Sequence, residues 1–562
     1  MSEKVESLRN VALVAHSGAG KTSLAEAMLF DSGTIKRLGR VEDGNAAMDF
    51  EPEELRRTSS ISSGFHQYEW KKYTTNIIDT PGDQNFFSDT RSCLQAADGV
   101  VVVIDAVDGI KVQTEQAWDF AAEFNQPCVI FINKLDRERA DFSLAFQGAG
   151  EIFKPKPIIL QLPIGTEAEF KGVVDLISGQ AFEYDENGKA RKIEIPPDMQ
   201  ESVENEKENL IENIAEADDE LVERYLEGEA LTEQELAAAL RKGTLARIFV
   251  PVVCGSATRN IGIDLLMKLI VDALPYPADQ GAKTGIDPAT EQEIERMPDP
   301  EAPFSGFVVK TLADPYAGRL SFIKVVSGTL GTDGTFYNAN KETKERFNQL
   351  LTIAGKEQKP ASGAGPGAIV AVAKLKETVT GDTLCEEANK IVYQCAEPLP
   401  SLISFAIEAK SKGDEDKIFI SLSKLLEEDP ALKLERISET KEILLSGLGQ
   451  IHVETAVERL KRKFNVEAIL KTPKVPYRET IKKKVRVQGK HKKQTGGSGQ
   501  YGRVAGYMEP VADEEFVFES KVVGGAIPTQ YIPSCEKGFL QCMAKGPKME
   551  LPVTGVKIVI ND

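Results

Sequence analysis

The sequence predicts a multidomain α/β protein, in which a domain built on a parallel sheet precedes an antiparallel β-barrel and two α+β sandwich-type domains, the last incomplete. Its 562 residues exceed what a single hydrophobic core supports, so several domains are required. The segments 100–104 and 129–132 are continuous apolar runs, typical of parallel strands covered on both faces. After a Pro- and Asp-rich linker at 297–303, β-branched residues and Gly-rich turns indicate short antiparallel strands.

The first expected elements are a strand at 10–14 and a helix at 22–30, joined by a Gly-rich loop. Such a turn points backbone N–H groups and the helix N-terminus at an anion. We expect Lys21 to reach the outer phosphates of a nucleotide and the Thr22 hydroxyl to bind Mg²⁺. Alanine stands where this motif usually has its first glycine. The residues assigned to phosphate binding are Ala15, His16, Ser17, Gly18, Ala19, Gly20, Lys21 and Thr22.

A second motif follows an apolar strand at 75–78. Asp79 ends that strand, where its carboxylate can hold Mg²⁺ through a water molecule. Gly82 lies just beyond, and its backbone N–H can contact the γ-phosphate and respond to its loss. Together with the Gly-rich loop, these residues predict the triphosphate end of a nucleotide site with Mg²⁺ as its metal.

Two further motifs predict which base is bound. Asn133, Lys134 and Asp136 follow a buried strand, at the carboxyl edge where doubly wound sheets bind ligands. Asp136 can accept hydrogen bonds from the guanine N1–H and 2-amino group, which adenine lacks, so the site would select guanine. Ser256 and Ala257 are expected to supply backbone donors to guanine O6.

These motifs assign residues 1–277 to a P-loop GTPase domain that binds GTP or GDP, with residues 161–245 as an inserted subdomain. An ATPase or a small-molecule kinase would explain the Gly-rich loop but not the guanine-binding residues. The remaining domains are expected at 278–395 for the β-barrel, 396–476 for an α/β domain with helices at 417–428 and 451–464, and 477–562 for a partial α+β domain.

The net charge of −19 is unevenly distributed along the chain. Residues 201–235 hold fourteen acidic and two basic residues, with apolar residues at helical spacing, which predicts amphipathic helices with an acidic face. Residues 471–503 hold eleven basic residues and one acidic residue and end in a Gly-rich loop. Either stretch can be a solvated surface, but the acidic helices also suit docking to a protein, and the basic stretch suits phosphate backbones.

Composition argues against several other classes of protein. No apolar run is long enough to span a bilayer, so we expect no membrane contact. The seven cysteines are scattered without paired spacing, which favours a reduced, cytoplasmic setting. Four histidines without Cys/His clusters argue against a structural zinc site.

With these motifs, the whole chain resembles bacterial elongation factor G, the translocase GTPase of the ribosome. Besides the nucleotide motifs, the resemblance rests on Asp43-Gly44, Met48-Asp49-Phe50, Gly328-Thr329-Leu330, and the segments 446–452, 464–468, 476–481 and 494–502. It implies a monomeric GTPase, stimulated by the ribosome, that couples hydrolysis to translocation of tRNA and mRNA. It also implies that the inserted subdomain contacts ribosomal stalk proteins, and that the 494–502 segment reaches the tRNA, mRNA and rRNA of the decoding region.

Three departures from the family bear on hydrolysis. Typical members have a histidine after Gly82 that positions the attacking water, whereas this chain has Asp83, which adds negative charge and offers no donor. By the resemblance, Gly82, Asp83 and Lys21 form the catalytic set. Gly18 replaces an aspartate of the family, and Ser60 replaces the switch I threonine that binds Mg²⁺. Thr58 or Ser59 remain alternatives to Ser60 in the alignment.

The departures resemble a divergent, paralogous branch of the family and leave two hypotheses for function. The first is a ribosome-dependent GTPase that moves tRNA and mRNA. The second is a hydrolysis-impaired, GTP-gated ribosome-binding factor with a regulatory or rescue role. A ribosomal protection protein shares the architecture, but the 494–502 segment is more similar to the translocase. Because the family continues into a fifth domain beyond position 562, we also expect the chain to be C-terminally truncated, with domain V absent.

Overall fold

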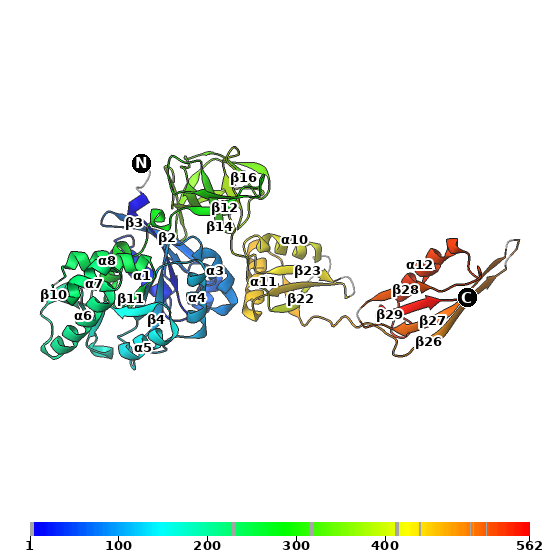
Figure 1. The fold of residues 1–562 in the computed structure, drawn as a ribbon, viewed down its shortest axis with the longest axis horizontal. Helices are drawn as coiled ribbons and strands as arrows, with labels where there is room; N and C mark the ends of the chain where they lie inside the picture. The colour runs from blue at the N-terminus through cyan, green and yellow to red at the C-terminus, as the bar shows by residue number, and fades with distance from the viewer. Residues whose placement is uncertain are drawn as a thin grey trace. The chain divides into compact units, whose positions relative to one another are not determined.

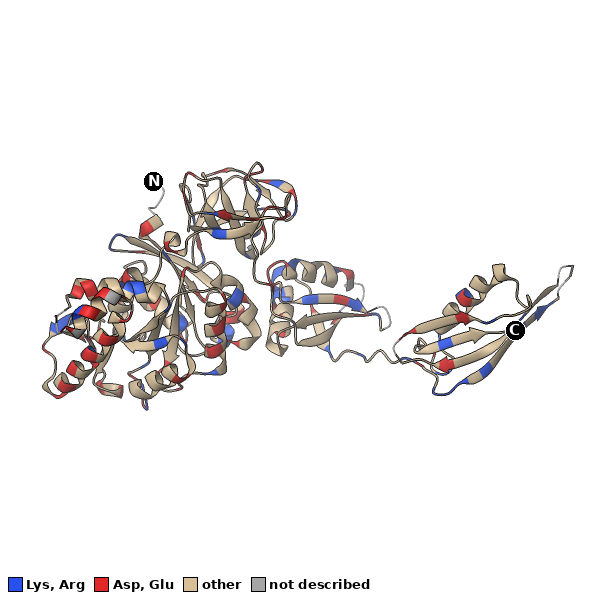
Figure 2. Cartoon of the chain, viewed as in Figure 1, with Lys and Arg blue, Asp and Glu red and all other residues tan. Residues whose placement is uncertain are grey.

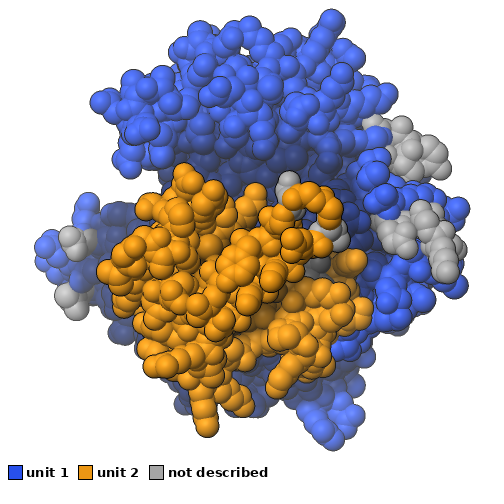
Figure 3. Space-filling model, turned by 90° about the vertical axis from the view of Figure 1, so that its right-hand side faces the viewer, with its two compact units in different colours: residues 1–436, 443–472 blue, residues 437–442, 473–562 orange. Residues whose placement is uncertain are grey.

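The computed structural model describes residues 5–227, 229, 231–314, 318–410, 415–437, 440–494, 496–497, 499–512 and 514–562. The chain divides into two compact units, which are coloured separately in Figure 3. Unit 1 comprises residues 1–436 and 443–472, and unit 2 comprises residues 437–442 and 473–562. The predicted multidomain α/β fold class is confirmed, while the domain boundaries stay predictions. Within these described ranges, no helix has the length and apolar character needed to cross a membrane.

A seven-stranded sheet of order β2-β3-β1-β4-β5-β11-β6 forms the centre of the first domain (Figure 1). Its strands are β1 (Leu8–Val14), β2 (Gly64–Trp70), β3 (Tyr73–Asp79), β4 (Gly99–Asp105), β5 (Cys128–Asn133), β6 (Lys156–Ile159) and β11 (Phe249–Cys254). All neighbours pair in parallel except β2, which runs antiparallel to β3. The helices of this domain are α1 (Lys21–Asp31), α2 (Pro52–Arg57), α3 (Phe87–Leu94), α4 (Val112–Glu123), α5 (Phe142–Ile152) and α9 (Ile263–Ala273).

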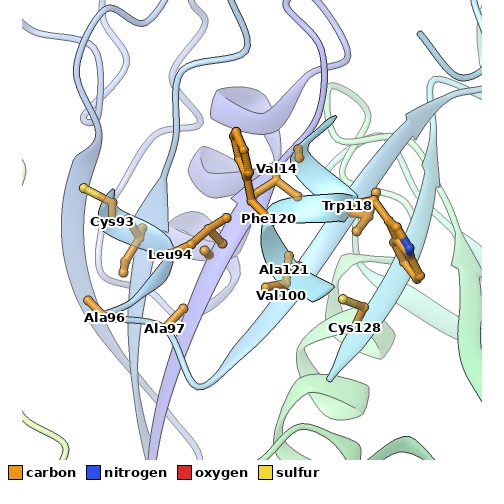
Figure 4. Close-up of a cluster of buried hydrophobic side chains, with 14 of the residues drawn as sticks. Val14, Cys93, Leu94, Ala96, Ala97, Val100, Trp118, Phe120, Ala121 and Cys128 are labelled. Carbon is orange, nitrogen blue, oxygen red and sulfur yellow. The ribbon is translucent and has the colours of Figure 1, made fainter. Parts of the chain in front are cut away.

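Strands β1, β4, β5 and β11 are buried along their whole length, as the continuous apolar runs at 100–104 and 129–132 predict for β4 and β5. Figure 4 shows part of the core around them, where Val14 of β1 and Val100 of β4 lie near Leu94 of α3 and Trp118 of α4. Dense packing of this kind fixes the carboxyl ends of the strands. The loops that leave those ends therefore start from rigid positions.

The inserted segment forms its own small sheet and three helices. The sheet has the order β10-β9-β8-β7, from β7 (Gln161–Ile164), β8 (Gly172–Asp175), β9 (Gln180–Tyr184) and β10 (Ala190–Ile193), and is followed by α6 (Gln200–Ala215), α7 (Asp219–Leu226) and α8 (Glu233–Leu245). Val203, Leu210 and Ile214 of α6 are buried, and many of the other positions along these helices are acidic residues (Figure 2). The predicted amphipathic acidic helices are therefore present.

The next part of unit 1 is a β-rich domain. A two-stranded ribbon of β12 (Lys283–Ile286) and β13 (Glu293–Arg296) precedes an eight-stranded antiparallel sheet of order β17-β16-β21-β14-β15-β20-β18-β19. The strands of that sheet are β14 (Ser305–Asp314), β15 (Gly318–Ser327), β16 (Gly334–Asn338), β17 (Thr343–Phe347), β18 (Leu350–Ala354), β19 (Glu357–Pro360), β20 (Ile369–Ala373) and β21 (Thr383–Cys385). The sheet curls around a core that includes Ile323, Phe336 and Phe347 (Figure 1).

A four-stranded sheet of order β23-β24-β22-β25, with two helices, completes unit 1. Its elements are β22 (Ile403–Ala409), α10 (Glu415–Leu426), β23 (Lys433–Ile437), β24 (Glu442–Gly447), α11 (Gln450–Phe464) and β25 (Ala468–Lys471). Both predicted helices are present, with their ends within two residues of the predicted positions, as is common for helix termini.

Unit 2 contains a sheet of order β26-β27-β29-β28 and one helix, α12 (Ile532–Met543). Its strands are β26 (Val485–Lys493), β27 (Gln500–Pro510), β28 (Phe516–Ser520) and β29 (Val556–Ile560). Strands β26 and β27 pair continuously from Val485 and Met508 to Lys493 and Gln500, so the Gly-rich segment joins the two strands of a long hairpin. Thr495 and Ser498 of that segment lie outside the described residues.

Candidate nucleotide-binding site

The Gly-rich loop joins β1 to α1, as the sequence predicts. Gly18 and Gly20 adopt φ angles of 88° and 98°, a left-handed conformation that side chains disfavour. A Cβ on Gly20 would also lie 2.4 Å from the Asn133 amide nitrogen. Gly20 is therefore required both for the turn and for the close approach of the base-binding motif to the loop.

Lys21 is buried at the start of α1 and folds back over the loop. Its ammonium donates to the carbonyl oxygens of Ala15 at 3.2 Å and His16 at 3.1 Å. Burial lowers the pKa of Lys21 to about 8, although the nearby Asp79 and Asp49 oppose that shift. The ammonium thus lies at the predicted phosphate end, bonded to the loop that would hold the phosphates.

The three predicted metal ligands come together around one hydroxyl group. Thr22 Oγ1 donates to Asp79 Oδ2 at 2.7 Å and lies 3.2 Å from Ser60 Oγ. Of the two alternatives to Ser60, Ser59 Oγ lies 3.5 Å from Ser17 Oγ in the loop, and Thr58 Oγ1 donates to the adjacent carbonyl. The geometry therefore supports Ser60 as the third member of the set.

This donor set suits a divalent cation. Asp79 Oδ1 is buried and has no hydrogen-bond partner among the described residues. Burial raises the pKa of Asp79 to about 6, and burial together with the charge of Asp79 raises the pKa of Asp49 to about 7. A bound cation favours the ionised form of such crowded carboxylates and takes oxygen ligands, so the residues fit Mg²⁺.

The Asp79–Gly82 turn packs directly on the phosphate loop. The Thr80 hydroxyl donates to the Leu13 carbonyl of β1 at 2.7 Å, which holds the turn against that strand. A Cβ on Gly82 would lie 2.4 Å from Lys21 Nζ and 2.6 Å from the backbone of His16. Position 82 therefore has no room for a side chain.

Asp83 is engaged within its own turn. Its Oδ1 accepts from the backbone N–H of Asn85 at 2.9 Å and from the Asn85 side-chain amide at 2.7 Å. Asp83 thereby caps η2 (Gln84–Phe86), as an N-terminal aspartate commonly does. The structure thus gives Asp83 a structural contact that the sequence-based interpretation, which considered it only as a replacement for a catalytic histidine, did not predict.

At the predicted base end, Asn133 links two loops. Its amide donates to the Ala19 carbonyl at 3.0 Å, and its Oδ1 accepts from the Ala257 N–H at 3.0 Å. Lys134 donates to the Gly18 carbonyl at 2.6 Å. The phosphate loop and both base-binding motifs are therefore joined by hydrogen bonds within the chain.

Asp136 differs from Asn133 and Lys134 because one of its carboxylate oxygens forms no hydrogen bond among the described residues. Oδ1 is buried and has no partner among the described residues, and Oδ2 lies 4.0 Å from the Arg137 guanidinium. An acceptor in that state suits the paired N–H donors of guanine. The backbone N–H groups of Ser256 and Ala257, predicted to face O6, instead donate to Ile261 and Asn133 in this structure.

Three contacts that position residues of the site were not predicted from the sequence. His16 is fixed by Thr114 of α4, whose hydroxyl lies 2.8 Å from His16 Nδ1. The Glu54 carboxylate accepts from the N–H groups of Ile61 and Ser62 at 3.1 and 3.2 Å, which closes the segment carrying the predicted metal ligand. The spacing of Glu51, Pro52 and Glu54 is that of a capping box and could have indicated this role.

The third missed contact is Asp105, which ends β4 and accepts from the Lys134 ammonium at 2.7 Å. His16, Asp105 and Asp108 lie within 4.8 Å of one another, a spacing that can suit a metal. However, Lys134 and Lys111 already pair with the two carboxylates, and burial lowers the pKa of His16 to about 4. We therefore assign Asp105 to the orientation of Lys134.

Helix α2, which leads into the segment with Ser60, is tied to α11 by charged pairs. The Arg462 guanidinium of α11 contacts Glu53 at 2.8 Å and also pairs with Glu51. Glu458 of α11 accepts from Arg57 at 3.3 Å and from Arg56. The segment that follows α2 and carries Ser60, here called the switch segment, is thus held by contacts from outside the first domain as well as from within it.

Four family comparisons match consecutive parts of the chain. The Elongation factor Tu GTP binding domain family matches residues 6–276, Elongation factor G domain 2 matches 303–387, Elongation Factor G, domain III matches 398–472, and Elongation factor G, domain IV matches 473–562.

Individual proteins are similar over the same length. Elongation factor G of Neorickettsia sennetsu is 40% identical over 564 residues, which cover 100% of this chain and 81% of that protein. A crystal structure of a protein from Thermus thermophilus superposes with a TM-score of 0.89 at 33% identity, covering 99% of this chain and 81% of that one.

Proposed function

This chain belongs to the elongation factor G family of GTP-binding translation factors, and from that premise we propose how its residues bind and hydrolyse GTP on the ribosome during translocation of tRNA and mRNA. The observation that carries the proposal is the unpartnered, buried oxygen of Asp136 beside a loop and turn already linked by Asn133. This arrangement offers a free acceptor to the N1–H and 2-amino donors of guanine, which adenine lacks.

At the phosphate end, Lys21 exchanges its bonds to the loop carbonyls for bonds to the outer phosphates. Gly82, which lies against Lys21 and the loop, brings its N–H close to the γ-phosphate. Thr22, Ser60 and Asp79 hold Mg²⁺, which supplies charge neutralisation at the phosphates when bound. These exchanges link the state of the nucleotide to the positions of the Asp79–Gly82 turn and the switch segment.

The partners follow from the family and from the charge of the two units. The acidic face of the inserted helices docks on ribosomal stalk proteins, and the basic β26–β27 hairpin of unit 2 approaches the rRNA, tRNA and mRNA of the decoding region (Figure 2). The protein acts as a cytoplasmic monomer. Its divergence from the housekeeping factor rests on Asp83 and Gly18 and remains a prediction.

The test is GTP hydrolysis with and without ribosomes, alongside a titration of GTP binding. Strong stimulation by ribosomes is the expected result. Tight GTP binding without any stimulation would contradict the catalytic part of the proposal and would leave a nucleotide-gated ribosome-binding factor.

Two variants at Asp83 separate its charge from its capping contact. Asp83→Asn removes the charge and keeps an oxygen that can accept from the Asn85 N–H, whereas Asp83→His restores the side chain typical of the family. If the negative charge slows hydrolysis, both variants raise the stimulated rate. If only a donor to the attacking water is lacking, Asp83→His alone raises it. Unchanged rates in both variants would remove Asp83 from the catalytic set.

A further inference from the structure

A cavity of about 250 Å³ lies away from the nucleotide site, between the first domain and the curled sheet of unit 1. The first domain contributes Asp98 and Gln126 to its lining, and the curled sheet contributes Phe307 and Lys324. The connecting ribbon of β12 and β13 adds one basic side chain from each strand. None of these residues belongs to the proposed GTPase machinery.

The two basic residues of the ribbon are direct cross-strand partners. Lys283 of β12 lies opposite Arg296 of β13 in the antiparallel register, so their side chains emerge from the same face. Like charges in that arrangement repel each other and destabilise a two-stranded ribbon. A pairing of this kind is stabilised when an anion lies between the two side chains.

Neither Lys283 nor Arg296 forms an ion pair with a carboxylate among the described residues. The Lys283 ammonium has no carboxylate partner among the described residues and lies over the rings of Phe307 at 4.7 Å and Tyr393 at 5.8 Å. Burial lowers the pKa of Lys283, an effect that Cys395 and Asp98 oppose and that the charge of Lys324 reinforces. Arg296 donates to the Asn389 carbonyl at 3.3 Å, but its buried Nε has no partner in the described ranges.

The third cation that lines the cavity is already neutralised. Lys324 donates to Asp98 Oδ1 at 2.9 Å and to the Ala96 carbonyl at 2.9 Å. The Asp98 carboxylate forms its ion pair with Lys324 and forms none with Lys283 or Arg296 among the described residues. The cavity consequently keeps an excess of about two positive charges.

We propose that this cavity binds a phosphate group, either free or carried by a small metabolite, held between Lys283 and Arg296. The guanidinium and ammonium supply charge-assisted hydrogen bonds to its oxygens. Gln126, which also lines the cavity, has a buried Oε1 without a partner in the described chain, and it accepts from the hydroxyl of a protonated phosphate. Sulfate is fully ionised and has no such donor, so the site prefers phosphate.

Binding there would affect how the first domain is coupled to the curled sheet. Gln126 and Asp98 belong to the first domain, Lys324 belongs to β15, and the ribbon connects the two. A bound phosphate would therefore join groups from both sides of the cavity and stabilise their packing. This role is independent of the proposed hydrolysis of GTP.

The test is calorimetric titration of phosphate into full-length protein in chloride buffer, with the nucleotide site saturated by a non-hydrolysable GTP analogue so that the Gly-rich loop is blocked. We expect saturable binding, weakened about tenfold or more by Lys283→Gln and by Arg296→Gln. Lys192→Gln, an exposed position on β10, is the matched control and leaves the affinity unchanged. We expect sulfate to bind more weakly than phosphate. Comparing the affinities of glycerol phosphate and inorganic phosphate distinguishes a phosphate group carried by a metabolite from free phosphate.

Thermal unfolding provides a second readout that also detects misfolded variants. In phosphate-free buffer of low salt, Lys283→Gln is expected to raise the melting temperature, because it removes the repulsion with Arg296. Phosphate then stabilises the wild-type protein but not the variant. The proposal is overturned by an absence of saturable phosphate binding, by equal phosphate affinity in wild type and both variants, or by an unchanged phosphate response of Lys283→Gln.

Discussion

The phosphate end and the base end of the nucleotide site differ in how their polar groups are satisfied. At the phosphate end, Lys21 donates to loop carbonyls and Thr22 donates to Asp79, so these groups already have partners within the chain. At the base end, Asn133 joins two loops, while one buried oxygen of Asp136 has no partner among the described residues. The hydrogen-bond donors expected to bind phosphate are thus engaged within the chain, whereas the acceptor expected to bind guanine, Asp136 Oδ1, is free among the described residues.

This difference assigns separate tasks to the two ends. A preformed acceptor needs no rearrangement, so binding energy at the base end appears as affinity and selectivity. At the phosphate end, a ligand must replace existing hydrogen bonds, which makes the surrounding turn responsive to whether the γ-phosphate is present. Substitutions at the base end should therefore change which base is bound, and those at the phosphate end should change the response to the γ-phosphate, through either the preference for GTP over GDP or the rate of hydrolysis.

The largest effect is expected for Asp136→Asn. An amide cannot accept from both guanine donors, so we expect GTP affinity to fall about 100-fold or more and xanthine nucleotides to be favoured instead. Equilibrium titration with GTP and XTP measures both. Arg137→Gln is the control, because Arg137 lies 4.0 Å from the same carboxylate and is exposed. Retained GTP affinity in Asp136→Asn would contradict the assignment of the base end.

The next effect is expected for Gly82→Ala at the phosphate end. Its Cβ would collide with the backbone of His16 and with Lys21, so the turn must move away from the loop. We expect GDP affinity to change little and ribosome-stimulated hydrolysis to fall about tenfold or more. Gly150→Ala is the control, because a Cβ at that position has no neighbour within 4 Å and its φ is outside the left-handed region, as at Gly82. Equal losses of GDP and GTP affinity in Gly82→Ala would argue against separate tasks for the two ends.

The sequence predicted the backbone of this site better than its contacts. The Gly-rich loop, the strand that ends at Asp79 and the asparagine at the end of β5 were identified because glycine turns and apolar runs leave a local pattern. The sequence did not show that the N–H groups of Ser256 and Ala257 are bonded within the chain. Ser256 donates to the carbonyl of Ile261 within the same turn, and Ala257 donates to Asn133, which is far away in the sequence, so neither bond leaves a local pattern.

Contacts between distant parts of the chain could not be predicted from the sequence either. The ammonium of Lys310 on β14 pairs with Asp89 of α3 at 2.7 Å. The two residues are far apart in the sequence, and helical or strand periodicity cannot predict contacts over such a separation. The direct opposition of Lys283 and Arg296 became visible only with the strand register. Helical and strand patterns report which face of an element is buried, but they do not report what lies against it.

A smaller effect is expected at Ser60, where the sequence alone left three candidates. Ser60→Ala removes the hydroxyl that lies 3.2 Å from Thr22 Oγ1, so we expect about a tenfold loss of Mg²⁺-dependent GTP affinity with GDP affinity nearly kept. Ser59→Ala and Thr58→Ala are matched controls in the same segment. Titrations of Mg²⁺ at fixed nucleotide measure the difference. A larger loss in either control would move the metal ligand to that residue.

The smallest effect is expected for Arg462→Ala, which tests how far the phosphate end depends on α11. Arg462 pairs with Glu51 and Glu53 at the start of α2, and partly exposed ion pairs of this kind each contribute about 0.2–1 kcal/mol. We expect stimulated hydrolysis to fall about two- to threefold with nucleotide affinity unchanged. Lys461→Ala, whose ammonium pairs with Glu467, controls for loss of a neighbouring charge. High salt should reduce the difference between the two variants, because screening weakens the pairs that only Arg462 makes with α2. If Arg462→Ala instead altered guanine affinity, recognition of the base by Asp136 would not be independent of the contacts of α11 with the phosphate end.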